Sequence, residues 1–211
     1  MTLLFLPNFF NQSQYMKTNL STFFIISSLL INGCTGSQTN EDFPELIFRN
    51  QPELLGVTLG FGSFSFELPK TYDQLDTLQF DRLKEVLSDS GNTFFENELL
   101  AAFTDEDISI LMISKINTKD ALLKLDEAYS DYQLSIPGAQ SINRTTFSLN
   151  GINIIQYEIS SEIMRRIKLF FTMSHDVFCL EFSVQNSNYN DKIIEFESSL
   201  STLKNVIKDT K

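Results

Sequence analysis

The sequence predicts a single α+β domain in which one antiparallel β-sheet of about six strands packs against helices. In the final third, stretches of alternating apolar and polar residues follow one another with turn sequences between them, as in antiparallel strands. Other stretches place apolar residues three and four positions apart, as in helices that pack by one face. The 211 residues and 42% hydrophobic content suit one domain with its own core.

The first half predicts a strand and then a helix. Residues 64–69 alternate apolar and polar and end in a proline, which terminates a strand. The glycine-rich residues 56–62 precede a strand rather than a helix, so we expect a strand or turn there instead of a dinucleotide-binding loop. A helix is predicted over 76–87, with Asp76 as its N-cap and Gly91 beyond its end.

The middle of the chain predicts a hairpin and a second helix. Residues 98–103 and 108–116 read as two strands joined by an acidic turn over 104–107. Thr118 can then cap a helix that runs to about Tyr132.

The final third predicts a meander of four antiparallel strands closed by an amphipathic helix that must lie on the sheet. Asn150-Gly151 is a strong hairpin signal, because both central residues of a type I′ turn need positive φ. The expected elements are strands 145–149, 152–159, 163–173 and 177–184, and a helix from Asn188 or Asn190 to about Ile207.

The N-terminal residues predict an export signal. Lys17 precedes an apolar run over 20–31, which is shorter than the ~20 residues of a membrane-spanning helix. Met16 would begin a more regular signal, so we interpret residues 1–15 as an over-extended start. These residues by themselves fit an ordinary secretory signal in which Cys34 is present by chance, and this is the alternative to a lipoprotein signal.

Ile31-Asn32-Gly33-Cys34 resembles the lipobox of bacterial lipoproteins. The resemblance implies a signal peptide over 1–33, acylation of Cys34 and an anchor in the lipid bilayer. Residues 34–43 are then a polar, flexible tether, and 44–211 form the domain. In the lipoproteins of enteric bacteria, a residue other than Asp after the cysteine favours sorting to the outer membrane. Thr35 follows Cys34 here, so we expect an anchor in the outer membrane, with the domain facing the periplasm or the cell surface.

Composition disfavours several classes of function. The formal net charge of -11 repels phosphate backbones, so we expect no nucleic-acid partner. With Cys34 acylated, Cys179 has no partner for a disulfide, and its strand context predicts a buried, inert thiol. His175, the one histidine, lies in a predicted turn. We therefore expect no enzyme activity, no catalytic residues and no cofactor.

Two charged groups are candidate sites. The carboxylates of Asp105, Glu106 and Asp107 suit Ca²⁺ or Mg²⁺ by type, but their spacing does not match an EF-hand, and we expect a solvated turn without metal. Arg166 and Lys168 share one face of a predicted strand and could form a patch for an anionic ligand or partner. Structural pairing with acidic residues is the alternative.

The order of elements over residues 60–207 resembles the Mog1/PsbP family, which implies an α/β/α sandwich. That resemblance implies a non-enzymatic protein-binding or assembly accessory of the envelope that acts by contact with a partner protein. A lipoprotein that binds a small ligand or a cation in a cleft between sheet and helices is the alternative. A hydrolase with paired carboxylates is a third possibility.

Overall fold

The computed structural model describes residues 42–89, 97–118, 120–125 and 139–206, all of which lie in one structural unit, Asn40–Lys211. The predicted signal peptide, Cys34, Gly91 and most of the predicted helix over 118–132 lie outside the described residues. No described helix is long and apolar enough to cross a membrane.

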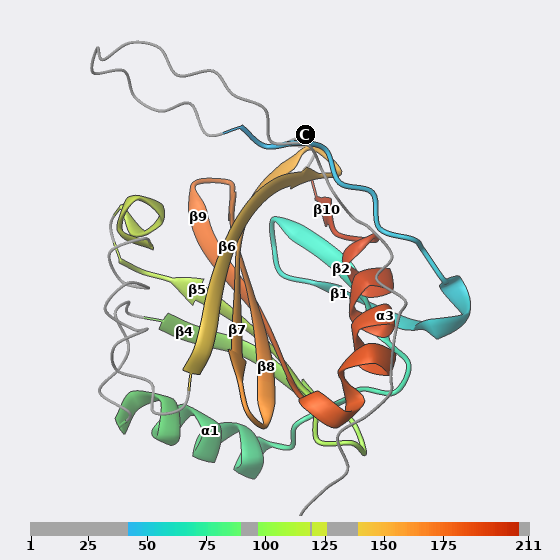
Figure 1. The fold of residues 1–211 in the computed structure, drawn as a ribbon. Coiled ribbons are helices and arrows are strands. Elements are labelled where there is room, and N and C mark those ends of the chain that lie inside the picture. Colours follow the sequence, from blue (N-terminus) through green and yellow to red (C-terminus); the bar gives the residue numbers. More distant parts are fainter. Residues whose placement is uncertain (1–41, 90–96, 119, 126–138, 207–211) are drawn as a thin grey trace, which may run out of the picture. The chain divides into compact units, whose positions relative to one another are not determined.

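A seven-stranded sheet forms the centre of the fold, with neighbouring strands antiparallel throughout (Figure 1). The predicted meander is confirmed, because β6 to β9 pair in chain order, and β9 then pairs with β5 of the predicted hairpin. In spatial order the strands are β3 (Asp73–Gln74), β4 (Asn97–Thr104), β5 (Ile110–Ile116), β9 (Asp176–Gln185), β8 (Met164–Met173), β7 (Ile152–Ser161) and β6 (Ala139–Leu149).

A separate three-stranded sheet contains the predicted strand 64–69. This strand, β2 (Phe64–Pro69), lies between β1 (Leu55–Gly60) and β10 (Lys204–Asn205). The glycine-rich stretch is therefore mostly strand. The α+β class is confirmed, but the structure has two sheets and more strands than the single sheet of about six that the sequence predicts.

The predicted β6–β7 turn and the predicted cap of the first helix are confirmed. Asn150 and Gly151 have φ of 52° and 75° between β6 and β7. The helix α1 (Thr77–Asp89) begins with a reciprocal cap: Gln79 N donates to Asp76 Oδ1 at 2.8 Å, and Asp76 N donates to Gln79 Oε1 at 3.3 Å. Three short 3₁₀ helices complete the described elements: η1 (Pro52–Leu54), η2 (Ala121–Lys124) and η3 (Asn186–Asn188).

The closing helix α3 (Tyr189–Leu200) is shorter than predicted. Thr202 Oγ1 bonds back to the carbonyl of Ser199 at 2.7 Å and also accepts the backbone N–H of Glu67 at 2.8 Å. Such side-chain bonds compete with the helix, and the chain then pairs with β2 as β10. The prediction of a helix to about Ile207 is wrong at its C-terminal end. Leu203 continues the apolar spacing of the helix in the sequence, but its side chain is buried beyond Leu200, where the chain has left the helix.

Both faces of the seven-stranded sheet are covered, as in the predicted sandwich. Ala101 belongs to the core under α3 and β2, whereas the next residue, Ala102, packs on the opposite face against α1. Phe196 of α3 stacks on Phe182 of β9 with ring centroids 4.6 Å apart. The helix α3 thereby covers the face of the sheet on which the candidate site lies (Figure 1).

Candidate functional site

A groove of about 340 Å³ opens beside α3, and we call it the α3 groove. This volume lies at the lower end of the range of small-molecule sites, about 300–1,000 Å³. It is lined by Pro44, Glu45, Leu46, Phe48, Thr145, Thr146, Phe147, Gln156, Glu158, Ile167, Tyr189, Ile193, Phe196, Glu197 and Leu200.

The first wall is the segment Pro44–Phe48, which runs along the edge strand β6. Ser148 N donates to Pro44 O at 2.9 Å, and Leu46 N donates to Ser148 O at 2.8 Å. The ring of Phe48 meets Phe147 edge-on, with centroids 6.0 Å apart. Backbone pairing and ring contact together hold this segment against the sheet.

The second wall is one face of α3, whose lining residues are spaced four, three, one and three positions apart from Tyr189 to Leu200. Asn150 Nδ2 holds the chain at the C-terminal end of the helix by donating to Ser201 O at 3.0 Å and to Leu203 O at 2.8 Å. The β6–β7 turn thus ties the helical wall to the strands that form the floor.

Three carboxylates and no Lys, Arg or His side chain line the α3 groove. Glu158 has a cation nearby, because Arg165 Nη1 lies 3.6 Å from its Oε1. The guanidinium of Arg165 also lies 4.2 Å from the ring centroid of Tyr189. Glu197 is half-buried without a hydrogen bond or ion pair to its carboxylate from any described residue, and burial raises its pKa.

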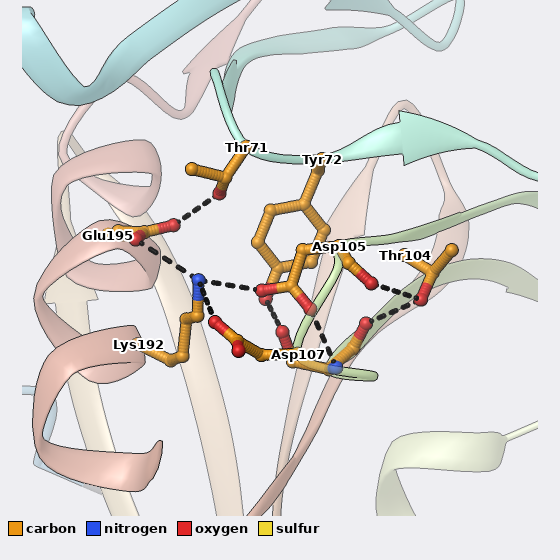
Figure 2. A network of polar contacts seen from close by, with 8 residues as sticks. Thr71, Tyr72, Thr104, Asp105, Asp107, Lys192 and Glu195 are labelled. Atoms are coloured by element: carbon orange, nitrogen blue, oxygen red, sulfur yellow. Dashed lines mark hydrogen bonds and ion pairs between the residues drawn. The ribbon is translucent and has the colours of Figure 1, made fainter.

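A second charged region, the Lys192 cluster, brings Lys192 and Glu195 of α3 together with Asp105 and Asp107 (Figure 2). Lys192 is 7% exposed, and its Nζ lies 2.8 Å from Asp105 Oδ2, 3.2 Å from Asp107 Oδ2 and 3.4 Å from Glu195 Oε1. Ser109 N donates to Asp105 Oδ1 at 2.9 Å. The cluster links α3 to the turn between β4 and β5.

The electrostatics of the Lys192 cluster favour its charged form. Burial alone would raise the pKa of Asp105, but hydrogen bonds from Lys192 and Ser109 outweigh it and lower that pKa. Burial alone would lower the pKa of Lys192, but Asp105 and Asp107 outweigh it and raise that pKa. The expectation of a solvated turn is therefore wrong for Asp105, which is buried, and Lys192 pairs with both Asp105 and Asp107. No group of three His, Cys, Asp or Glu among the described residues could hold a metal ion.

The structure places Arg166 and Lys168 on the sheet face opposite the α3 groove. Ile167 between them lines the groove, and side chains alternate along β8. Lys168 Nζ forms an ion pair with Glu181 Oε2 on the neighbouring strand at 3.0 Å. A role of Arg166 and Lys168 as a patch for an anionic partner stays a prediction.

The remaining candidates lie apart from the groove lining. Cys179 is a free, buried thiol, and burial raises its pKa to about 12, so it is a poor nucleophile. His175 is exposed in the β8–β9 turn with φ of 75°. The α3 groove could not be predicted from the sequence, because its lining comes from five separate segments: Pro44–Phe48, β6, β7, β8 and α3. The one local signal is Glu197, a charge beside the apolar stripe of a helix.

No family model and no curated protein sequence matches this chain. The solved structures that are similar to this chain include three of low identity. LpqN of Mycobacterium tuberculosis, described as involved in cell envelope biogenesis, is 10% identical with a TM-score of 0.44, covering 72% of this chain and 90% of LpqN. The cyanobacterial PsbP protein CyanoP of Synechocystis sp. PCC 6803 is 13% identical with a TM-score of 0.44, covering 81% and 98%.

A protein of Bacteroides thetaiotaomicron is 12% identical with a TM-score of 0.42, covering 70% of this chain and 46% of its own. Similarity this low says nothing about the activity, ligand or partner of this chain. Membership of the Mog1/PsbP family stays a prediction.

Proposed function

We propose that this chain is a non-enzymatic binding protein of the bacterial cell envelope, anchored through acylated Cys34, which holds a small ligand with a large apolar part in the α3 groove. The observation that carries the proposal is the groove itself. Its volume of about 340 Å³ and its apolar walls of Leu46, Phe48, Ile193 and Phe196 match the usual construction of small-ligand sites.

The composition of the lining supports binding rather than chemistry. It contains no histidine, cysteine, serine or lysine, the side chains that most often act as nucleophile or base. Glu158, a carboxylate that could take part in hydrolysis, already has a cation beside it, because Arg165 Nη1 lies 3.6 Å from its Oε1.

The position of the groove along the chain supports a role close to a membrane. At about 3.5 Å per residue, the chain between Cys34 and Pro44 spans at most roughly 35 Å. An acylated Cys34 would therefore keep the wall formed by Pro44–Phe48 near the bilayer surface. A ligand of the envelope could reach the groove there without crossing the bulk solvent.

One observation favours a protein-binding accessory as the second candidate. Ile47 is 87% exposed and lies between two residues that line the groove, Leu46 and Phe48. A partner protein that covered Ile47 would remove a large apolar side chain from water and close the groove at the same time. Crosslinking separates this candidate from the first.

The test of the groove is recovery of the protein from membranes, followed by mass spectrometry of the small molecules bound to it. Ile193→Trp fills the groove, and Ile194→Trp is the matched control, because Ile194 is exposed on the same helix and does not line the groove. We expect one compound with a large apolar part to be bound to the wild type and to Ile194→Trp, and to be lost from Ile193→Trp. An equal amount bound to a folded Ile193→Trp protein would overturn the proposal.

The test of the anchor and of the second candidate is crosslinking in intact cells with recovery of the membrane fraction. We expect the wild type in the membranes and Cys34→Ala in the soluble fraction. One dominant crosslinked protein that is lost with Ile47→Asp would favour the accessory. A Cys34→Ala protein that stays in the membranes would show that Cys34 is not the anchor.

A further inference from the structure

The α3 groove has a charge pattern that its apolar walls do not require. Glu45, Glu158 and Glu197 line it, and no basic side chain does. Carboxylates are seldom placed beside apolar surface without a partner, because burial disfavours the ionised form. The carboxylates in the lining therefore indicate the charge of the ligand that the groove binds.

Glu197 is the clearest case. It lies next to Phe196 on the face of α3 that carries Ile193 and Leu200, so its carboxylate is half-buried beside apolar side chains. Among the described residues none donates a hydrogen bond to it, and burial raises its pKa. The Lys192 cluster, on the same helix, shows the contrasting case of carboxylates beside a cation, because Lys192 Nζ lies 2.8 Å from Asp105 Oδ2 and 3.4 Å from Glu195 Oε1.

The rim of the groove already accommodates one cation. The guanidinium of Arg165 lies 4.2 Å from the ring centroid of Tyr189 and 3.6 Å from Glu158 Oε1. An aromatic face and a carboxylate together are the usual surroundings of organic cations in proteins. Arg165 offsets part of the charge of Glu158 but leaves Glu197 without a counter-charge.

We infer that the ligand of the α3 groove is an amphiphilic organic cation, an alkyl chain with an ammonium group, and that Glu197 is its counter-ion. The inference rests on the proposed function and narrows its ligand class. The alkyl chain lies against the apolar walls, where removal of apolar surface from water drives binding. The ammonium is paired with Glu197, and the side chains of Gln156 and Thr145 in the lining offer oxygen acceptors for further N–H donors.

Other ligand classes fit the lining less well. An alkyl carboxylate or phosphate would bring a negative charge against three carboxylates, which repel it. A bare metal ion needs several oxygen ligands and finds apolar side chains over most of the groove. A neutral alkyl ligand fits the walls but leaves Glu197 uncompensated.

The test uses three probes of equal chain length: octylammonium, 1-octanol and octanoate. Isothermal titration near neutral pH measures their binding to the full-length Cys34→Ala chain, purified free of lipid and detergent. We expect octylammonium to bind at least about tenfold more tightly than 1-octanol, and octanoate to bind most weakly.

Single substitutions locate the counter-ion. Glu197→Gln keeps the shape of the side chain and removes its charge, so we expect octylammonium affinity to fall about tenfold while 1-octanol affinity stays unchanged. Glu158→Gln is expected to have a smaller effect, because Arg165 already lies beside that carboxylate. Glu98→Gln is the matched control, since Glu98 is exposed on β4, near the other edge of the sheet from β6.

The outcomes separate this inference from the proposed function. Equal affinity for octylammonium and 1-octanol, or a preference for octylammonium that persists in Glu197→Gln, would overturn the cationic ligand and leave an apolar-ligand site standing. Failure of all three probes to bind the parent chain would contradict the groove as a ligand site as well.

Discussion

The helix α3 carries two charged regions that differ in how their charges are compensated. In the Lys192 cluster a buried ammonium lies within 3.4 Å of oxygens from Asp105, Asp107 and Glu195. In the α3 groove, Glu197 has no cation from the described residues within ion-pair distance, although it is half-buried. One region joins the helix to the strands, and the other leaves a carboxylate available to a ligand.

The difference follows from the energetics of buried charge. A carboxylate removed from water needs a partner, and the partner can belong to the protein or to a ligand. A site whose charges are already paired within the protein leaves no uncompensated charge for a ligand to pair with. We therefore propose that the Lys192 cluster stabilises the fold and that the α3 groove binds a ligand. Four measurements test how these charges and the C-terminal end of α3 contribute to stability.

The largest effect is expected from Lys192→Met. The substitution leaves Asp105 buried without its cation, so we expect the free energy of unfolding in urea to fall by about 3–5 kcal/mol. Lys204→Met is the control, because Lys204 is exposed on β10, and we expect it to change stability by no more than about 0.5 kcal/mol. Equal effects of the two substitutions would show that the cluster does not stabilise the fold.

Low pH is expected to have the second-largest effect on stability. The pKa of Asp105 is lower in the folded protein than its ordinary value of about 3.9, so its contribution to stability is complete above that value and is lost as the pH falls through the lowered pKa. Thermal unfolding between about pH 5 and pH 2 should show a steeper loss for the wild type than for Asp105→Asn. Parallel curves for the two proteins would contradict the lowered pKa.

A smaller effect is expected at the C-terminal end of α3. Asn150→Gly keeps the positive φ that the turn requires but removes the two hydrogen bonds to the carbonyls of Ser201 and Leu203. We expect the free energy of unfolding to fall by about 1–2 kcal/mol. Asn153→Ala, at an exposed position on β7, should change stability little. An Asn150→Gly protein as stable as the wild type would show that these bonds do not hold the helix.

The smallest effect, of opposite sign, is expected from Glu197→Gln. The pKa of Glu197 is raised in the folded protein, so the ionised form destabilises the fold as the pH rises above the ordinary value of about 4.3. Because solvent reaches this half-buried group, we expect removal of the charge to stabilise the ligand-free protein by only a few tenths of a kcal/mol near neutral pH. Urea unfolding at about pH 7 and pH 4 measures it. Destabilisation near neutral pH would mean that Glu197 has a partner in the fold.

Predictions from the sequence succeed where the signal is local. Asn150-Gly151 predicts the β6–β7 turn, and Asp76 predicts the start of α1, because positive φ and a side-chain cap depend on neighbouring residues alone. They fail where two distant segments compete for one residue. Leu203 fits the stripe of a helix, but pairing of Lys204 with Ser65 of β2 ends the helical segment earlier.

Spacing along the chain is thus sufficient to predict the α+β class, the meander of β6 to β9 and an amphipathic closing helix. The second sheet, the pairing of Lys192 with Asp105 and the α3 groove depend on the tertiary structure. Each brings together residues far apart in the sequence, such as Leu46 and Ile193, whose shared place in the groove no local period encodes. Burial then decides the role of each carboxylate, because the same kind of side chain is a structural partner beside Lys192 and an uncompensated charge in the groove.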